Sequence, residues 1–375
     1  MEVRRVMTKK RTATSGQLVR RGDVAATPAT TAPKQLIADL RRMIEESRQG
    51  VAQTVNTALV WLYWNIGKRI REDILKQKRA EYGEQIVSSL SRQLAAEYGR
   101  GFAARNLFRM IRFAEVFPDE QIVSSLMAQL SWTHFIYIIP IDDPLKRDFY
   151  AEMCRVERWS TRTLQKKIDG MLFERTALSK KPAKLARQEL AALRDEDRLT
   201  PDLVFRDPYF LDFLGLKDTY AEKDLEAAIL RELEAFILEL GVGFTFVARQ
   251  KRIAIDGKDY YLDLLFYHRG LRRLVAIDLK LGAFEAADKG QMELYLRWLD
   301  RHERQPGEDS PLGLILCAGK SDEHVELLRL DETGIRVSVY LTELPPRKLL
   351  EKKLHEAVRT ARARLAARER NDGTP

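Results

Sequence analysis

The segment over residues 274–281 is apolar apart from two ions, Asp278 and Lys280. Side chains two positions apart on a β-strand point to the same face, so these two charges are expected side by side. An ion in such apolar surroundings is costly unless it is paired, hydrogen-bonded or bound to a metal. Residues 260–267 repeat the pattern with Asp263. Two neighbouring strands with one acid each indicate a divalent-metal site with a lysine beside it.

The chain after Pro201 has the pattern of an α/β domain over residues 201–346, with a central mixed sheet. The hairpin signal Asp256-Gly257 joins two of its apolar segments. The expected elements, in order, are a helix at 224–240, strands at 244–255, 260–268 and 272–281, a helix at 287–304, a strand at 311–318, a helix at 322–330 and a strand at 335–342.

The rest of the chain predicts helices, so the whole is expected to be an α+β protein of two domains. Residues 34–176 have helical periodicity and form the expected N-terminal domain. Residues 177–200 are charged and Ala-rich, which suits a linker or a connecting helix. Residues 1–33 are expected to be a disordered basic tail, and residues 347–375 a basic C-terminal helix and tail.

Composition places the chain in a reducing cytoplasm without membrane contact. The 375 residues include two cysteines, too few for a disulfide framework or a zinc cluster. The apolar run at residues 135–141 is far too short to span a bilayer, and no secretory core follows the basic start. The net charge of +9 arises largely from the two termini, so it is weak support for nucleic-acid binding by itself.

A basic segment inside the folded body is more informative, because residues 61–117 carry eleven Lys and Arg against six acids. Two helices separated by a glycine turn at residues 99–101 have the outline of a helix-turn-helix. The second helix carries the candidate nucleic-acid-binding residues Arg105, Asn106, Arg109 and Arg112. The alternative is an ordinary amphipathic helix with a solvated basic face.

The set formed by Asp263, Asp278-Leu279-Lys280 and a later Gln291-x-x-x-Tyr295 resembles the PD-(D/E)XK nuclease superfamily. The surrounding sequence, over about residues 40–345, is similar to the YhcG-like bacterial family of that superfamily. The chain departs from the superfamily pattern in two places. Leu262 stands where the motif proline is expected, and the second acid is Asp278 where Glu is usual.

The resemblance implies Mg²⁺-dependent hydrolysis of phosphodiester bonds in DNA, with Mn²⁺ as a second possible ion. Asp263 and Asp278 would hold the metal together with a third acid from the preceding helix. Lys280 would orient or deprotonate the attacking water, or bind the phosphate. The candidates for the third acid are Glu226, which we favour, Glu232 and Glu234.

Two residues of the helix that follows complete the expected site. Gln291 would position water or a phosphate, and Tyr295, on the same helix face, would pack or hydrogen-bond near it. Tyr295 is also a candidate nucleic-acid-binding residue. His268, at the end of a predicted strand, is expected on the surface. The helical domain is expected to bind DNA or a partner, either another protein or a second copy of the chain.

Three alternatives remain open. Asp278 and Lys280 could form a plain ion pair at the end of a sheet. The shorter acid Asp278 favours a catalytically inactive DNA-binding or assembly factor that keeps the nuclease fold. Action on RNA is the third alternative, because no residue singled out here recognises a 2′-hydroxyl.

Overall fold

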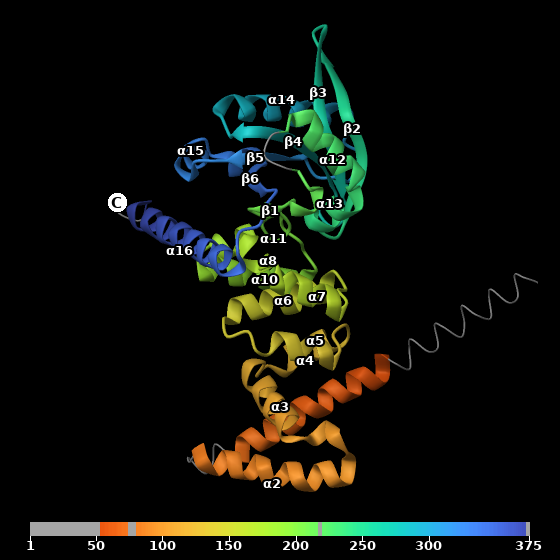
Figure 1. Ribbon diagram of the computed structural model, residues 1–375, viewed down its shortest axis with the longest axis vertical. Coiled ribbons are helices and arrows are strands. Elements are labelled where there is room, and N and C mark those ends of the chain that lie inside the picture. Colours follow the sequence, from red (N-terminus) through yellow and green to blue (C-terminus); the bar gives the residue numbers. More distant parts are fainter. Residues whose placement is uncertain (1–52, 74–79, 217–219, 373–375) are drawn as a thin grey trace, which may run out of the picture. The chain divides into compact units, whose positions relative to one another are not determined.

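The computed structural model describes residues 53–73, 80–216 and 220–372 (Figure 1). The expected basic tail at residues 1–33, and the helical pattern from Lys34 up to residue 52, lie outside these ranges. Helices occupy the described chain up to Val204, and the sheet follows. In the ranges that are described, no helix is both long enough and apolar enough to cross a membrane.

The helical region is a series of short helices around an aromatic core. Phe113, Phe117 and Phe135 pack against one another, and the indole of Trp64 donates to the carbonyl of Phe117 over 2.8 Å. After helical residues 53–73, the elements are α2 (Ala80–Tyr98), η1 (Arg100–Phe102), α3 (Ala104–Val116), α4 (Glu120–Met127), α5 (Trp132–Ile138), α6 (Pro144–Val156), α7 (Thr161–Asp169), α8 (Leu172–Arg175), α9 (Ala177–Lys180), α10 (Ala183–Glu196) and α11 (Pro201–Val204).

Residues 177–200 form α9 and α10 rather than an extended connection. In α10, Ala186, Leu190 and Leu193 follow the i, i+4, i+7 spacing of a buried helix face. All three lie in the same core as the aromatic residues of the helical region. Arg155 of α6 holds the end of α10 by donating to the carbonyl of Leu193. This segment therefore packs as part of the helical region.

The mixed sheet predicted from the sequence is confirmed, with six strands in the order β1-β6-β5-β4-β3-β2. β2, β3 and β4 are antiparallel neighbours, whereas β4, β5, β6 and β1 run parallel. The strands are β1 (Tyr209–Phe210), β2 (Phe244–Ile255), β3 (Lys258–His268), β4 (Arg273–Ala283), β5 (Leu312–Gly319) and β6 (Ile335–Leu341). β1 was not predicted, because two residues are too short for a periodic signal.

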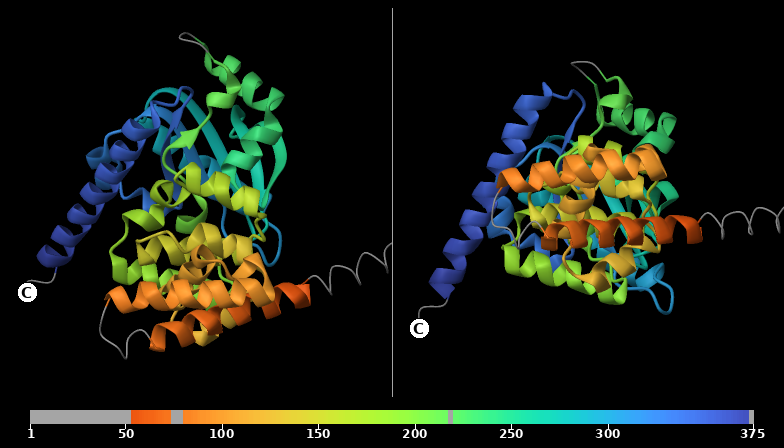
Figure 2. Two further views of the ribbon diagram at one scale, coloured as in Figure 1. Left: turned by 60° about the horizontal axis from the view of Figure 1, so that its bottom comes forward. Right: turned by 90° about the horizontal axis from the view of Figure 1, so that it is seen from below.

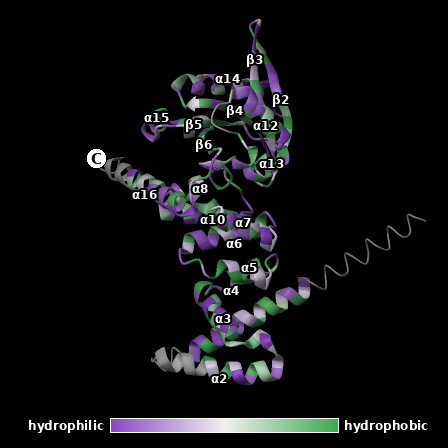
Figure 3. Cartoon of the chain, viewed as in Figure 1, coloured by the Kyte–Doolittle hydropathy of each residue, from purple (hydrophilic) through white to green (hydrophobic). Residues whose placement is uncertain are grey.

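Helices cover both faces of the sheet, as Figures 1 and 2 show. One face packs on α12 (Glu222–Arg231) and α13 (Leu233–Leu240), and the other on α14 (Ala286–His302). The single helix predicted at 224–240 is broken at Glu232. The elements η2 (Asp212–Leu214), α15 (Asp322–Leu327) and η3 (Leu330–Thr333) complete this domain, and α16 (Arg347–Asp372) follows. Hydrophilic residues prevail along α16 (Figure 3).

The side chain of His268 is fully buried, so the expectation of a surface position was wrong. Its Nδ1 accepts the backbone N–H of Leu271, and its ring meets the edge of Phe244. Gly243 and Gly270 make room for the ring, because a Cβ at either position would lie within 3.3 Å of it. Burial lowers the pKa of His268 to about 4, which keeps the imidazole neutral.

A buried charge cluster joins the helical region to the sheet domain. The carboxylate of Glu239 on α13 lies 2.5 Å from a guanidinium nitrogen of Arg175 on α8 and 3.1 Å from one of Arg206. Both arginine side chains are nearly inaccessible, with 3% and 4% exposed. The backbone N–H of Phe210 also donates to Glu239. Each charge in this cluster therefore has a partner that replaces water.

Candidate active site

The two strand acids lie where β3 and β4 part. The β3–β4 ladder runs from His268 and Arg273 to Leu264 and Ile277, so its next pair would be Asp263 and Asp278. Beyond that point β3 continues to pair with β2, and β4 continues to pair with β5. The divergence leaves backbone groups without a ladder partner and opens space for side chains between the strands.

Asp263 occupies the end of the ladder. Its Oδ2 accepts the backbone N–H of Leu279 over 2.8 Å, and so replaces the missing strand partner. Its Oδ1 accepts from Nε2 of Gln250 over 3.1 Å. Burial raises the pKa of Asp263, although these two hydrogen bonds and Lys280 oppose the shift. The carboxylate is thus fixed by the main chain at one oxygen and by the amide of Gln250 at the other.

Asp278 and Lys280 lie side by side on β4, as the two-residue spacing predicted. Asp278 is 3% exposed, and its Oδ2 lies 2.9 Å from Nζ of Lys280 without the angles of a hydrogen bond. Burial raises the pKa of Asp278 to about 6, and the charge of Asp263 adds to this shift while Lys280 opposes it. Burial would lower the pKa of Lys280, but Asp278 and Asp288 reverse this and raise it. Lys280 therefore carries its charge at neutral pH.

α14 brings the predicted Gln291 to the lysine. Oε1 of Gln291 lies 3.5 Å from Nζ of Lys280, and its Nε2 donates to the hydroxyl of Tyr295 over 2.5 Å. That hydroxyl donates to the carbonyl of Tyr261. Tyr295 is 1% exposed, which leaves no surface for a nucleic acid, so its expected contact with DNA is corrected. It orients Gln291 instead.

Among the three helical acids, the structure brings Glu226 to the site. Its Oε2 accepts from Nε2 of Gln250 over 2.8 Å, and the same nitrogen donates to Asp263. Glu232 lies at the break between α12 and α13, where its nearest cation is Arg231. Glu234 is exposed on α13. Glu222 lies one turn before Glu226, and its charge adds to the rise in the pKa of Asp263.

Gln250, Glu222 and Asp288 are the residues of this site that the sequence reasoning missed. Gln250 has a φ of 44° within β2, next to a register shift between Phe246 and Ala248. A positive φ is rare for residues other than Gly and Asn, and it often marks a functional constraint. A polar residue in an exposed strand gives no such signal from sequence alone.

Asp263 and Asp278 fit a divalent ion by their chemistry. Within the described part of the chain, no group of three or more His, Cys, Asp or Glu side chains is close enough to form a ready-made metal cluster. The two aspartates, however, are like charges at one point of the sheet, Asp278 buried and Asp263 half-buried, and Oδ2 of Asp278 accepts no hydrogen bond. Carboxylate oxygens are the ligands that Mg²⁺ and Mn²⁺ prefer. The amide of Gln250 links Glu226 to this pair.

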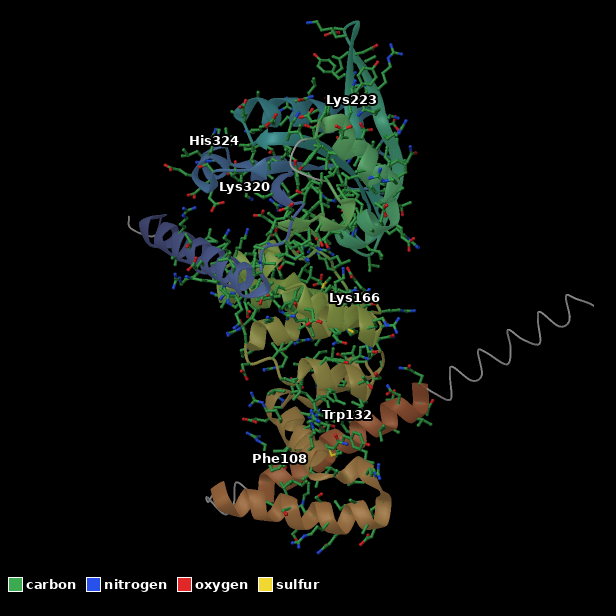
Figure 4. All side chains as sticks on the ribbon, viewed as in Figure 1. Phe108, Trp132, Lys166, Lys223, Lys320 and His324 are labelled. Atoms are coloured by element: carbon green, nitrogen blue, oxygen red, sulfur yellow. The ribbon has the colours of Figure 1, made fainter. Side chains whose placement is uncertain are left out.

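The basic helix predicted from the sequence is α3, which follows α2 and the single turn η1. Asn106 donates to the carbonyl of Gly101 and accepts from Arg109. Arg112 is paired with Glu115 and Asp142, which reduces its availability for phosphate. Arg105 is exposed, as is the neighbouring ring of Phe108 (Figure 4). The free positive charge of this helix is thus concentrated at its N-terminal half.

The mixed sheet, with two acids and a lysine at its parting strands, defines a nuclease domain of the PD-(D/E)XK type. Residues 202–355 match the family model described as the YhcG PDDEXK nuclease domain, and residues 39–175 match the DUF1016 N-terminal domain. The chain is 35% identical over 358 residues to the Escherichia coli (strain K12) protein named "Putative nuclease YhcG", covering 87% of this chain and 94% of that one. The chain belongs to the YhcG family of this superfamily.

Two solved structures are similar to part of the chain. A repair endonuclease from Pyrococcus abyssi is 20% identical, with a TM-score of 0.24 over 35% of this chain and 50% of its own. EndoMS in complex with double-stranded DNA is 18% identical, with a TM-score of 0.26 over 35% of this chain and 49% of its own.

Proposed function

We propose that this YhcG-family protein hydrolyses phosphodiester bonds in DNA with the help of Mg²⁺. The observation that carries the proposal is the placement of Asp263 and Asp278 at the point where β3 and β4 part, with Lys280 beside them. Three charges at the end of an apolar ladder are expensive for the fold, and a ligand that needs them accounts for their presence.

Asp263, Asp278 and Glu226 would hold the ion, with Mn²⁺ as an alternative to Mg²⁺. When bound, such an ion lowers the pKa of a coordinated water and neutralises charge that develops on the scissile phosphate. The raised pKa of Asp278, caused first by burial and then by the charge of Asp263, favours this role, because a nearby cation offsets both effects.

Lys280 serves in this proposal as a fixed positive charge on the phosphate. Asp278 and Asp288 raise its pKa against the effect of burial, which favours the charged ammonium form. Asp278 and Gln291 hold its ammonium group from two sides, and Tyr295 holds Gln291 in turn. The lysine would therefore meet the transition-state charge without first being reoriented.

A second candidate function is that of a DNA-binding or assembly factor without catalysis. Asp278 favours it, because this acid is shorter than the usual Glu and already has Lys280 as a partner. Purified protein incubated with Mg²⁺ and linear, circular or branched DNA decides between the two functions. Cleavage supports the hydrolase, and salt-sensitive binding without cleavage supports the factor. RNA of the same sequence tests the remaining alternative.

Addition of Mg²⁺ or Mn²⁺ is expected to raise the thermal unfolding temperature of the full chain. An ion present at about 100 times its Kd stabilises the folded state by about 2.7 kcal/mol. We expect this rise to disappear in Asp263→Asn and to weaken in Glu226→Gln. The matched control is Glu234→Gln on α13, which should respond like the unaltered protein. A full response in Glu226→Gln would contradict its place as the third acid.

The double variant Arg105→Ala/Arg109→Ala is expected to bind duplex DNA more weakly than the unaltered protein if α3 contacts the phosphate backbone of the DNA. Each lost phosphate contact lowers the slope of log K against log salt by about one, so the double variant should show a slope lower by about two. Fluorescence anisotropy over a series of salt concentrations measures this. Arg112→Ala is the control, because Glu115 and Asp142 already pair with that side chain. An unchanged slope in the double variant would place the DNA contact elsewhere.

A further inference from the structure

Residues 251–262 form a two-stranded arm that leaves the sheet beside the acidic site. β2 and β3 pair out to Ile255 and Lys258, whereas β3 pairs with β4 only from Leu264 onward. Asp256 and Gly257, both with positive φ, close the arm as the two-residue turn that the sequence predicted. Figure 1 shows the arm extending past the other strands.

One side of the arm is packed and the other is open. Ile253 and Leu262 are buried in the same core as residues of α14, and Lys251 is paired with Glu303. Because side chains alternate along paired strands, the opposite side carries Arg252 across from Tyr261 and Ala254 across from Asp259. These four residues are all exposed.

The open side leads to the acidic site. The next pair toward the sheet on this side is Gln250 and Asp263, which are hydrogen-bonded to each other and, through Gln250, to Glu226. The backbone at Tyr261 is fixed as well, since its carbonyl accepts the hydroxyl of Tyr295. A nucleic-acid strand bound along the open side of the arm would therefore lead directly into the acidic site.

The open side has the chemistry that binds single-stranded nucleic acid. The side chain of Tyr261 is 50% exposed, which leaves a ring face on which a base can stack. Arg252 lies directly across from it and is paired at 2.9 Å with Asp259. An exposed ion pair of this kind contributes little, so a phosphate can replace Asp259.

We propose that the open side of the arm binds unpaired nucleotides next to the cleaved phosphodiester, with Tyr261 stacking on a base and Arg252 contacting a phosphate. This inference rests on the proposed function, because it names the DNA structure that enters the same site. A continuous duplex keeps its bases stacked on each other and offers no base face to Tyr261. The protein therefore selects single strands, forks or flaps over blunt duplex.

Binding without metal tests the arm separately from catalysis. The full chain is titrated in EDTA against a fluorescein-labelled single strand, the same strand in a fork, and the same strand in a blunt duplex. We expect tighter binding to the first two. Tyr261→Ala should lower the affinity for the single strand and the fork about tenfold, near the lower end of the value of one base stack. Its affinity for the blunt duplex should be unchanged. Tyr261→Phe keeps the ring and should retain the affinity, whereas Arg252→Ala should lower the salt slope by about one.

Val247→Ala on β2 is the matched control, because that side chain is 49% exposed but offers no ring. Equal affinity of the unaltered protein for fork and blunt duplex overturns the proposal. So does a Tyr261→Ala variant that binds the fork as tightly as the unaltered protein. A fork preference that depends on Tyr261, without cleavage in Mg²⁺, supports the arm and contradicts only the proposed hydrolysis.

Discussion

Lys280→Ala is expected to lower the rate of DNA cleavage by about 10²–10³-fold at saturating substrate, the usual effect of removing one preorganised charge from a developing oxyanion. The ammonium group is held between Asp278 and Gln291. Initial rates on a fluorescent DNA substrate, with Mg²⁺ in excess, measure the effect. Binding of the same DNA in EDTA should change far less.

Lys289→Ala provides the matched control for this variant. Lys289 lies on α14 with 24% of its side chain exposed, close to the 22% of Lys280, and is paired with Glu293. Its loss should leave the cleavage rate nearly unchanged, because its partners, Glu293 and the carbonyl of Leu328, are not residues of the proposed site. Cleavage that survives both Lys280→Ala and Asp263→Ala would show that the active site lies elsewhere.

Glu239→Ala is expected to destabilise the protein by about 3–5 kcal/mol, because it leaves Arg175 and Arg206 buried without an anion. The carboxylate is the common partner of both guanidinium groups and also accepts from the N–H of Phe210. Urea unfolding of the full chain, followed by circular dichroism, measures the change. Glu234→Ala on the same helix is the control and should shift the midpoint little. A loss below about 1 kcal/mol in Glu239→Ala would mean that water reaches the cluster.

The pKa of the Glu239 carboxylate predicts how the difference in unfolding free energy between Glu239→Ala and the unaltered protein depends on pH. Burial alone would raise the pKa of Glu239, but Arg206 and Arg175 hold it below its ordinary value of 4.5. A carboxyl with a lowered pKa in the folded state contributes stability above its unfolded pKa and loses it as the pH falls through the folded value. The difference in unfolding free energy between Glu239→Ala and the unaltered protein should therefore be constant around neutral pH and become smaller as the pH falls into the acid range.

The strand acids and the lysine could be predicted because a charge within an apolar run is visible in sequence. Asp263, Asp278 and Lys280 stand out in this way, and the structure places them together at one strand end. Apolar segments likewise predicted the strands, and the turn signal Asp256-Gly257 predicted the hairpin. These features depend on neighbours close in the chain, where periodicity is informative.

The other parts of the site depend on geometry that periodicity does not encode. Gln250 reaches two acids only because its backbone has positive φ, and Glu226 is distinguished from Glu232 and Glu234 only by the break that ends α12. Tyr295 was expected to pack or hydrogen-bond near Gln291, which it does, and also to bind nucleic acid. Spacing fixes the helix face but not whether that face meets solvent or the core, and here it meets the core.

The two oxygens of Asp263 have separate tasks, since Oδ2 ends the β3–β4 ladder at Leu279 and Oδ1 faces Gln250. An asparagine at this position would keep an oxygen for the first task while losing the charge needed for the second. A single base change could thus remove the charge on which the proposed chemistry depends and still keep the contact that ends the β3–β4 ladder. A descendant that keeps the fold but lacks the proposed chemistry is consequently only one substitution away.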